Sequence, residues 1–214
     1  MMRWSSMTDA AERLIWPRGL QCLRCGCLSG GEAICSGCRA ELNALICREM
    51  VESCGSALWH RGAARDLVLR LKFGCEADCA SVLAGFMMEP AALMELTPET
   101  VLTWVPMPDD RFRERGIDHA QLLCRAVASL LKLPVQPLLR RTGYRLHTQK
   151  GLNAHSRRKN LLGAFAAAGK ISAPVLLIDD VYTTGATAFA CTQALLEGGA
   201  PSVQVLTAAR TPRK

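Results

Sequence analysis

The strongest chemical pattern in the sequence lies in residues 175–187, VLLIDDVYTTGAT, where an apolar run meets two acids and a Thr-Gly turn. The apolar run predicts a strand buried on both faces of a parallel sheet. Asp179 and Asp180 follow at its carboxyl end, which is where ligands bind in open α/β sheets. Because each carboxylate accepts from O–H donors, the pair suits two neighbouring sugar hydroxyls, such as those of ribose.

The turn after the acids predicts a phosphate site. Gly185 lets the backbone come close to a ligand, and Ala186 and Thr187 open a helix whose free N–H groups favour an anion. Threonine hydroxyls add further donors. The alternative is that Thr183 and Thr184 only cap the helix and that the aspartates are solvated loop acids. Two acids between a buried strand and this turn favour the ligand-binding interpretation.

Two Cys-x-x-Cys pairs near the N-terminus form a second pattern. Cys22 and Cys25 make one pair, and Cys35 and Cys38 make the other. Each pair brings two thiolates within reach of one ion, and four thiolates complete the tetrahedron that structural zinc prefers. A redox pair and buried thiols are the alternatives, and the paired spacing favours zinc.

The other cysteines fit less specific roles. Cys27 could compete with Cys25 for the metal but breaks the paired spacing. The remaining six are predicted to be small core residues: Cys47, Cys54, Cys75, Cys79, Cys124 and Cys191. The first residues lack the apolar stretch of an export signal, and no apolar run approaches the ~20 residues that span a membrane. Reduced thiols and a cytoplasmic location are therefore expected.

The charge balance points to anionic partners. The 214 residues include 26 basic and 19 acidic side chains, which gives a formal net charge of +7. Phosphates, nucleotides or nucleic acid fit this balance, and a solubilising surface explains it equally well. Residues 140–160 are strongly basic and are predicted to form a loop, but Tyr144 is the one aromatic residue there, which gives little support to a base-stacking platform.

Strands and helices must alternate to position these groups. Strand, loop, helix and strand follow in this order, which implies right-handed βαβ units and a parallel sheet. The predicted strands are 101–106, 175–179 and 202–208, and the predicted helices are 1–19, 61–73, 81–96 with a break at Pro90, 118–131 and 186–197. An Arg-rich loop is expected between Pro108 and Gly116. We predict a cysteine module with a leading helix over residues 1–54 and an α/β domain over residues 55–214.

The segment 175–187 resembles the signature of the type I phosphoribosyltransferases, which bind phosphoribosyl pyrophosphate (PRPP). The whole chain is similar to the ComF family, also called GntX-like or competence-associated phosphoribosyltransferase-like proteins. The motifs that carry this resemblance are CLRCG and CSGC, LKFG (71–74), VPMP (105–108), RERGIDHAQLL (113–123), TQKGLNAHSRRKNLLGAF (148–165), the signature itself and AAR (208–210). The resemblance implies a phosphoribosyltransferase-like fold, a parallel sheet flanked by helices, with a small four-cysteine zinc module at the N-terminus.

The resemblance also implies roles for individual residues. Asp179 and Asp180 would bind the ribose 2′- and 3′-hydroxyls, and residues 183–187 would cradle the 5′-phosphate. Candidates for the pyrophosphate are Arg111, Arg113, Arg115 and Gly116, with Lys72 as a further matching position. The loop 140–160 would close over the site, and its matching positions are Gln149, Arg157 and Asn160.

Two functions follow as expectations. In the first, an enzyme transfers the 5-phosphoribosyl group from PRPP to a nitrogenous acceptor and releases pyrophosphate, with Mg²⁺ on the ligand and with Asp179, Asp180 and Arg115 as catalytic candidates. In the second, a non-catalytic adaptor for DNA uptake binds a ribose phosphate and contacts protein or single-stranded DNA. The family usually has Asn-Gln where this chain has Asp118 and His119. Asp118 either weakens pyrophosphate binding by its charge or caps the following helix.

Overall fold

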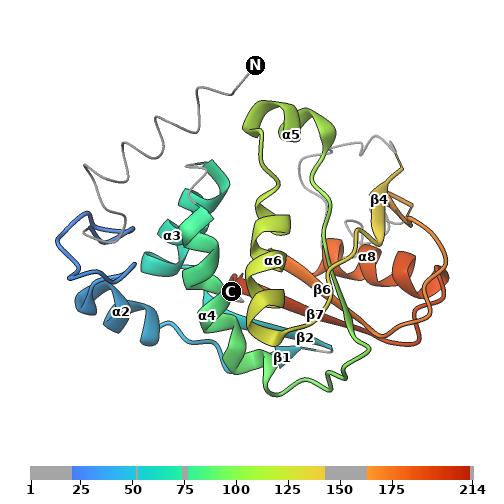
Figure 1. Ribbon diagram of the computed structural model, residues 1–214, viewed down its shortest axis with the longest axis horizontal. Helices are drawn as coiled ribbons and strands as arrows, with labels where there is room; N and C mark the ends of the chain where they lie inside the picture. The colour runs from blue at the N-terminus through green and yellow to red at the C-terminus, as the bar shows by residue number, and fades with distance from the viewer. Residues whose placement is uncertain (1–20, 52, 74–76, 143–162, 213–214) are drawn as a thin grey trace.

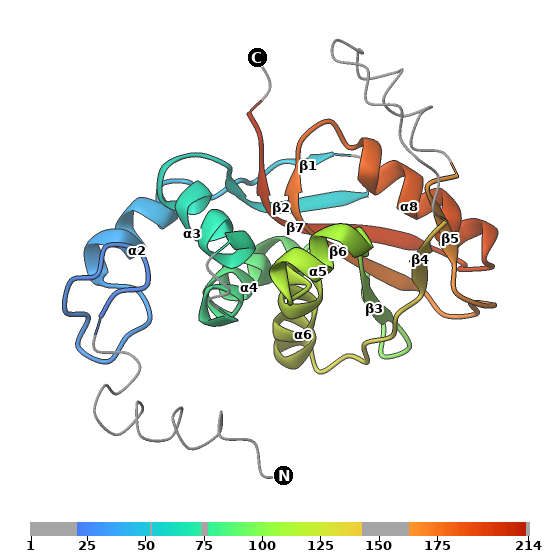
Figure 2. The same cartoon turned by 90° about the horizontal axis from the view of Figure 1, so that it is seen from above.

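A five-stranded sheet forms the centre of the computed structural model, which describes residues 21–51, 53–73, 77–142 and 163–212. Its strand order is β1-β2-β7-β6-β3 (Figures 1 and 2). The strands are β1 (Met50–Val51), β2 (Cys54–Trp59), β7 (Val203–Arg210), β6 (Val175–Tyr182) and β3 (Val101–Trp104). β2, β7, β6 and β3 run parallel, and β1 pairs with β2 in the antiparallel sense. The predicted parallel sheet is therefore confirmed.

Helices cover both faces of this sheet (Figure 2). One face carries α3 (Gly62–Phe73), α4 (Ala77–Ala91) and α6 (His119–Leu131), and the other carries α8 (Ala186–Glu197) beside a hairpin of β4 (Leu139–Arg141) and β5 (Phe165–Ala167). The side chains of β6 alternate between the two cores, with Leu176 and Ile178 toward α3, α4 and α6. Val175 and Leu177 pack on the α8 side. This two-sided burial explains why the strand reads as a continuous apolar run.

The cysteine module packs against the domain rather than standing apart from it. Its helix α2 (Ser36–Asn43) contacts α3, and Cys22, Cys38 and Leu42 belong to the same buried cluster as the apolar face of α3. The boundary predicted between residues 54 and 55 falls within β2, and the division into two domains stays a prediction. The predicted helix 1–19 lies outside the described residues.

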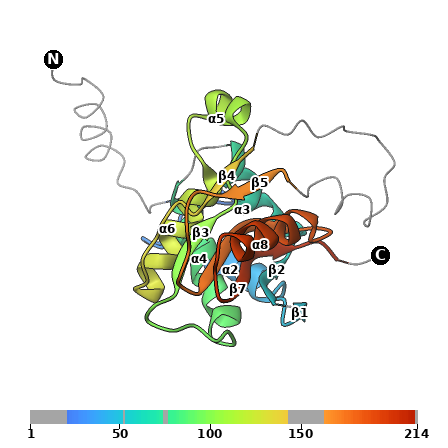
Figure 3. The same ribbon diagram turned by 90° about the vertical axis from the view of Figure 1, so that its right-hand side faces the viewer.

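The short helix α5 (Asp109–Arg115) replaces the Arg-rich loop expected there, so that prediction is wrong. Pro108 occupies the N-cap, acidic residues fill the first turn, and arginines fill the last, which complements the helix dipole. Gly116 ends the helix with a left-handed φ of 71°. Figure 3 shows α5 projecting beyond the sheet and the helices that cover it, and Figure 1 shows the same arrangement from another side. The helix thereby holds its arginines above the edge of the sheet.

The other elements follow the predicted pattern with shifted ends. Pro90 lies in the last turn of α4, and the helix ends one residue later. The helix predicted over 118–131 is α6, and Asp118 is its N-cap. β2, β4 and β5 were not expected from the sequence. None of the helices in the described ranges combines the length and apolar character needed to cross a membrane.

Candidate functional site

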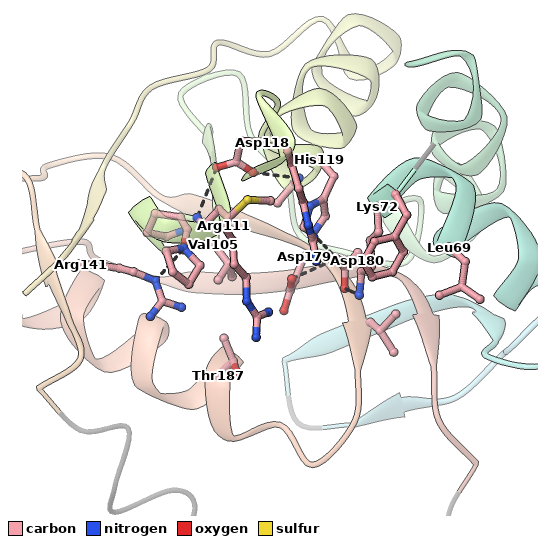
Figure 4. Close-up of a pocket in the computed structure, with 17 residues that line it drawn as sticks. Leu69, Lys72, Val105, Arg111, Asp118, His119, Arg141, Asp179, Asp180 and Thr187 are labelled. Carbon is pink, nitrogen blue, oxygen red and sulfur yellow. Dashed lines mark hydrogen bonds and ion pairs between the residues drawn. The ribbon is translucent and has the colours of Figure 1, made fainter. Parts of the chain in front are cut away.

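A pocket of about 440 Å³ opens at the carboxyl ends of β3 and β6 (Figure 4). Arg141 lies at one end of it and Lys72 at the other, with Asp179 and Asp180 between them. Its polar lining comes from six elements: Lys72 of α3, Arg111 and Arg115 of α5, Asp118 and His119 at the start of α6, Arg141 of β4, Asp179 and Asp180 of β6, and Thr187 of α8. The fold thus gathers residues that lie more than 100 positions apart in the sequence.

The two aspartates lie inside β6, not after it, because the strand continues to Tyr182. Successive side chains of a strand point to opposite faces. Asp180 faces α3 and α6, where Lys72 Nζ lies 2.9 Å from its Oδ1 and His119 Nε2 lies 2.6 Å from its Oδ2. Asp179 follows Leu177 on the face that α8 covers. The acids therefore have different surroundings, although they are neighbours in the sequence.

Asp180 is an ionised residue whose two oxygens are both occupied by protein groups. Burial disfavours its charge, but the hydrogen bond from His119 and the cation of Lys72 outweigh burial and hold its pKa below the ordinary value. Its side chain is 8% exposed, against 24% for Lys72. A ligand hydroxyl can reach Asp180 only by sharing these oxygens with Lys72 and His119.

Asp179 has the opposite electrostatic character. Burial first, and then the negative charge of Asp180, raise its pKa to about 8. Its Oδ1 accepts a hydrogen bond from the Asp180 N–H at 2.9 Å, and the residue lines the pocket. A carboxyl group with this pKa is neutral or ionised near neutral pH, so it can donate to a ligand or accept from one.

We expect Asp179 to make the protein less stable as the pH rises. Between the ordinary pKa of about 4 and the folded-state pKa of about 8, the folded protein binds more protons at this position than the unfolded chain does. The free energy of unfolding should fall across this window, by at most about 1.4 kcal/mol per pH unit. Urea unfolding of wild type and Asp179→Asn over the same pH series measures the difference, and a difference that does not change with pH would contradict the assignment.

The turn after β6 has the geometry of an anion site. Gly185 is the N-cap of α8 with a left-handed φ of 75°, and a Cβ added there would lie 2.6 Å from Cζ of Tyr182. Glycine is therefore required both by the backbone and by the ring beneath it. The first amides of α8 have no partner within the helix, and the Thr187 side chain lines the pocket beside them. Ala186 N–H donates to Thr184 Oγ1 at 3.4 Å, a weak capping contact.

The remaining residues of the predicted turn lie outside the pocket lining. Thr183 is exposed, and Ala186 is buried in the first turn of α8. Gly185 lines a smaller cavity of about 200 Å³ behind the turn, next to Tyr182. Within this motif, Asp179, Asp180 and Thr187 line the main pocket, whereas Gly185 shapes the turn through its backbone.

Three arginines line the pocket, and the sequence indicated two of them. Arg111 and Arg115 were expected, whereas Arg113 of the same helix is exposed and outside the lining. Arg141 was not expected, because β4 was assigned to a loop. Its Nε donates to the Pro106 carbonyl at 3.0 Å, and its guanidinium lies 4.8 Å from the centre of the Phe165 ring. Burial lowers the pKa of Arg141, as expected for a cation held inside the protein.

Asp118 confirms the capping interpretation. Its Oδ1 accepts hydrogen bonds from the N–H groups of Ala120 and Gln121 at 3.0 and 3.2 Å. Its Oδ2 accepts from Trp104 Nε1 at 3.1 Å and from the Met107 N–H at 3.3 Å. Four donors therefore stabilise this charge, and the carboxylate fixes the loop after β3 to the start of α6.

The two Cys-x-x-Cys pairs form one cluster. The sulfurs of Cys22, Cys25, Cys35 and Cys38 all lie within 4.8 Å of one another. A tetrahedral zinc with Zn–S bonds of ~2.3 Å has sulfurs about 3.8 Å apart, and the Cys25 and Cys35 sulfurs are 3.7 Å apart. Burial opposes ionisation of Cys22, but hydrogen bonds from backbone N–H groups lower its pKa to about 6. The group has the donor set and compactness of a metal site.

Cys27 lies beside this cluster without completing it. Its sulfur is 3.3 Å from that of Cys25, and hydrogen bonding with Cys25 and Cys35 raises its pKa to about 12. Burial raises the pKa of Cys38 to about 12 as well, so geometry and not pKa separates the two thiols. Cys27 is not among the four sulfurs that all lie within 4.8 Å of one another. Five further cysteines are buried as predicted: Cys47, Cys54, Cys79, Cys124 and Cys191. Cys75 and the loop positions Gln149, Arg157 and Asn160 lie outside the described residues.

Solved phosphoribosyltransferases resemble the fold only distantly. Glutamine PRPP amidotransferase from B. subtilis has 15% sequence identity and a TM-score of 0.43, over 66% of this chain and 30% of that one. Adenine phosphoribosyltransferase from Leishmania tarentolae has 16% identity and a TM-score of 0.40, over 74% of this chain and 78% of that one.

Sequence relatives give a closer comparison, although no family model matches the chain. DNA utilization protein YhgH of Salmonella typhi is 30% identical over 155 residues, which cover 68% of this chain and 66% of YhgH, slightly under two thirds of its length. Competence protein F of Haemophilus influenzae is 36% identical over 120 residues, 53% of this chain and 51% of that protein. Competence protein ComFC of Streptococcus pneumoniae is 29% identical over 189 residues, 84% of this chain and 82% of that protein. With relatives of these names, the chain belongs to the ComF family.

Proposed function

We propose that the pocket binds PRPP and that the protein transfers its 5-phosphoribosyl group to a nitrogenous acceptor, releasing pyrophosphate. One observation carries the proposal. A carboxyl group, the N-terminus of α8 and three arginines converge on a single cavity of about 440 Å³ at the carboxyl end of β6. A phosphorylated sugar needs these partners together, namely acceptors for its hydroxyls and donors for its phosphates.

Each part of the ligand has a matching part of the pocket. The 5′-phosphate would bind the turn 183–187, with the first amides of α8 and the Thr187 hydroxyl as donors. A ribose hydroxyl would bind Asp179, and the second would approach Asp180 beside its bonds to the protein. The pyrophosphate would lie near Arg111, Arg115 and Arg141, whose planar guanidinium groups bind phosphate oxygens in pairs.

Catalysis in this arrangement would rest on positioning and on charge. The ribose carbon would gain positive character as the pyrophosphate leaves, and the carboxylate of Asp180, joined by Asp179 when that group is ionised, suits that charge. Arg115 and its neighbours would neutralise the leaving group. Among the described residues the cysteine cluster is the one group of three or more possible metal ligands, so Mg²⁺ would be held mainly by ligand oxygens and water.

The same reasoning extends to the cysteine module. We propose that its four thiols hold one structural zinc, because four sulfur donors in a closed site match that ion. The metal would have no part in the chemistry of the pocket. A cytoplasmic location, where thiols stay reduced, is part of the proposal.

The names of the relatives favour a second candidate function. Relatives called competence proteins and a DNA utilization protein support an adaptor role in DNA uptake. In that case the pocket would sense a ribose 5-phosphate ligand without turnover, and the protein would contact the uptake machinery or single-stranded DNA. The net charge of +7 is compatible with an anionic partner.

Calorimetric titration with PRPP and with ribose 5-phosphate, in the presence of Mg²⁺, tests the binding proposal. Both ligands should bind, because both offer hydroxyls and a 5′-phosphate. Arg111→Met should weaken PRPP binding about ten- to hundredfold, the effect of losing a hydrogen bond to a charged group. The same change should leave ribose 5-phosphate binding almost unaltered.

Arg113→Met is the matched control, since Arg113 belongs to α5 but lies outside the pocket lining. It should leave both affinities unchanged. A wild-type protein that binds neither ligand at millimolar concentration would contradict the phosphoribosyl proposal. Pyrophosphate release from PRPP across a panel of nucleobases then separates the two functions, because binding without release supports the adaptor.

A further inference from the structure

Arg210 is a buried cation that the roles assigned above do not use. It is the last residue of β7, and its side chain is the largest of those that are fully buried, at 2% exposure. Its Nη1 atom has no hydrogen-bond partner in the described part of the chain. Arginine is almost never fully buried without such partners. The position therefore calls for a reason other than packing.

The guanidinium of Arg210 rests on an aromatic ring that leads to the phosphate turn. Its central carbon lies 5.0 Å from the centre of the Tyr182 ring. Tyr182 is the last residue of β6 and is directly opposite Arg210 in the parallel register. The Thr211 N–H donates to the Tyr182 carbonyl at 3.0 Å, which fixes the two strand ends side by side. Tyr182 is itself buried, so the stack is held from all sides.

The far edge of the Tyr182 ring supports Gly185. The ring fills the space that a Cβ at Gly185 would need, at 2.6 Å from Cζ. Gly185 is the N-cap from which the amides of α8 follow. Arg210, Tyr182 and Gly185 thus form a continuous column of contacts that ends at the backbone of the turn 183–187. A shift of the ring would move the amides that the proposed function assigns to the 5′-phosphate.

The electrostatics point in the same direction. Burying a guanidinium with an unpaired nitrogen costs free energy, and an apolar side chain of similar size would avoid that cost. A doubly charged phosphate at the N-terminus of α8 would offset it, because attraction between charges is strong in a medium of low dielectric constant. A guanidinium with one unpaired buried nitrogen is therefore best suited to the ligand-bound protein.

We propose that Arg210 is a positioning residue for a phosphate monoester on the turn 183–187, acting through Tyr182 and through its own charge. This inference rests on the proposed function, since it assigns a support to the same phosphate site. The inference predicts that Arg210 increases the affinity for the ligand and lowers the free energy of unfolding. Such a trade-off between activity and stability is common at functional sites.

Three variants test this inference. Arg210→Met keeps the bulk and removes the charge and the planar stack. Arg210→Lys keeps the charge alone. Val175→Ala is the matched control, because Val175 is buried on the α8 face at the start of β6, at the opposite end of the strand from Tyr182, and lines neither the main pocket nor the smaller cavity behind the turn. Each variant is compared with wild type by titration with ribose 5-phosphate, by melting temperature, and by hydrogen exchange of residues 183–187 without ligand.

Arg210→Met should weaken ribose 5-phosphate binding about tenfold, raise or preserve the melting temperature, and speed exchange in residues 183–187. Arg210→Lys should bind the ligand better than the methionine variant. Val175→Ala should lower the melting temperature without changing affinity or exchange in the turn. Unchanged affinity in Arg210→Met, or a fall in affinity that merely accompanies a fall in melting temperature, would overturn the inference.

The exchange measurement keeps this test separate from the proposed function. If wild type fails to bind ribose 5-phosphate, the phosphoribosyl proposal fails by itself. Faster exchange in residues 183–187 of Arg210→Met, absent in Val175→Ala, would still support Arg210 as the support of the turn. Equal exchange in these two variants would overturn it.

Discussion

Replacing Cys38 with serine is expected to abolish metal binding and to unfold the cysteine module. Metal binding supplies roughly 10–16 kcal/mol in small structural zinc sites, whereas truncating an ordinary core residue costs about 2–5 kcal/mol. Cys38 is 4% exposed and shares a buried cluster with the apolar face of α3. Loss of the module should therefore expose part of the main core as well. Elemental analysis and thermal unfolding of the reduced full-length protein measure both effects.

Cys27→Ser is the matched control for this result. Cys27 lies close to the cluster but outside the group of four sulfurs that all lie within 4.8 Å of one another. The variant should retain one metal ion and nearly all of its stability. A wild-type protein that is folded without metal would disprove the zinc site. If Cys27→Ser lost the metal as completely as Cys38→Ser, the set of ligands would be wrong.

The second large effect is expected at Asp179, where substitution by asparagine should weaken ribose 5-phosphate binding about ten- to hundredfold. Above its pKa of about 8 the Asp179 side chain is a charged acceptor, whose hydrogen bonds contribute about 1.5–3 kcal/mol and which an amide oxygen cannot replace. The loss of affinity should therefore be largest in a titration at a pH above 8. Asp179 lines the pocket with one oxygen engaged by a backbone N–H. The substitution removes the proposed contact with the ligand. It also removes a carboxyl group whose pKa is raised in the folded protein, so the free energy of unfolding above neutral pH should increase.

Asp180→Asn should differ from Asp179→Asn in its effect on stability. Both oxygens of Asp180 are bonded to protein cations or donors, so the amide would leave Lys72 without its partner. The free energy of unfolding should therefore fall, and affinity should fall with it as Lys72 and His119 lose their positions. Chemical unfolding and titration of both variants separate these roles, with the exposed Asp109→Asn of α5 as control. Identical stability changes at the two acids would refute the division between them.

The fold was predictable wherever one element carries its own signal. The spacing of apolar residues predicted α6 and α8, and the long apolar run predicted β6. β2 gave no such signal, because its first residues are Cys-Gly-Ser-Ala and its burial depends on β7, about 150 positions away. The helix α5 was missed because its arginines suggested a loop, although the acids at its start and Gly116 at its end are ordinary helix signals.

The site shows the same division between local and long-range information. Asp179 and Thr187 belong to one continuous motif and were expected in the pocket, where both lie. Arg141 reaches it from a hairpin whose pairing is long-range, so the sequence did not indicate it. The different surroundings of Asp179 and Asp180 were predictable in principle. Adjacent residues of a strand point to opposite faces of the sheet. This rule applies to Asp179 and Asp180 because β6 extends beyond them to Tyr182.

Arg24 lies between the cysteine cluster and α3, and its Nη1 donates to Cys38 Sγ at 3.6 Å. Its Nε lies 3.0 Å from Asp66 of α3, and the same helix carries Lys72 at its end. If this route couples the proposed metal site to the proposed ligand site, the coupling must be reciprocal. By whatever factor an occupied cysteine cluster raises the affinity of the pocket, an occupied pocket must raise the affinity of the cluster for its metal. In a cell with little available zinc, the supply of the phosphorylated ligand would then help to decide how many molecules keep their metal.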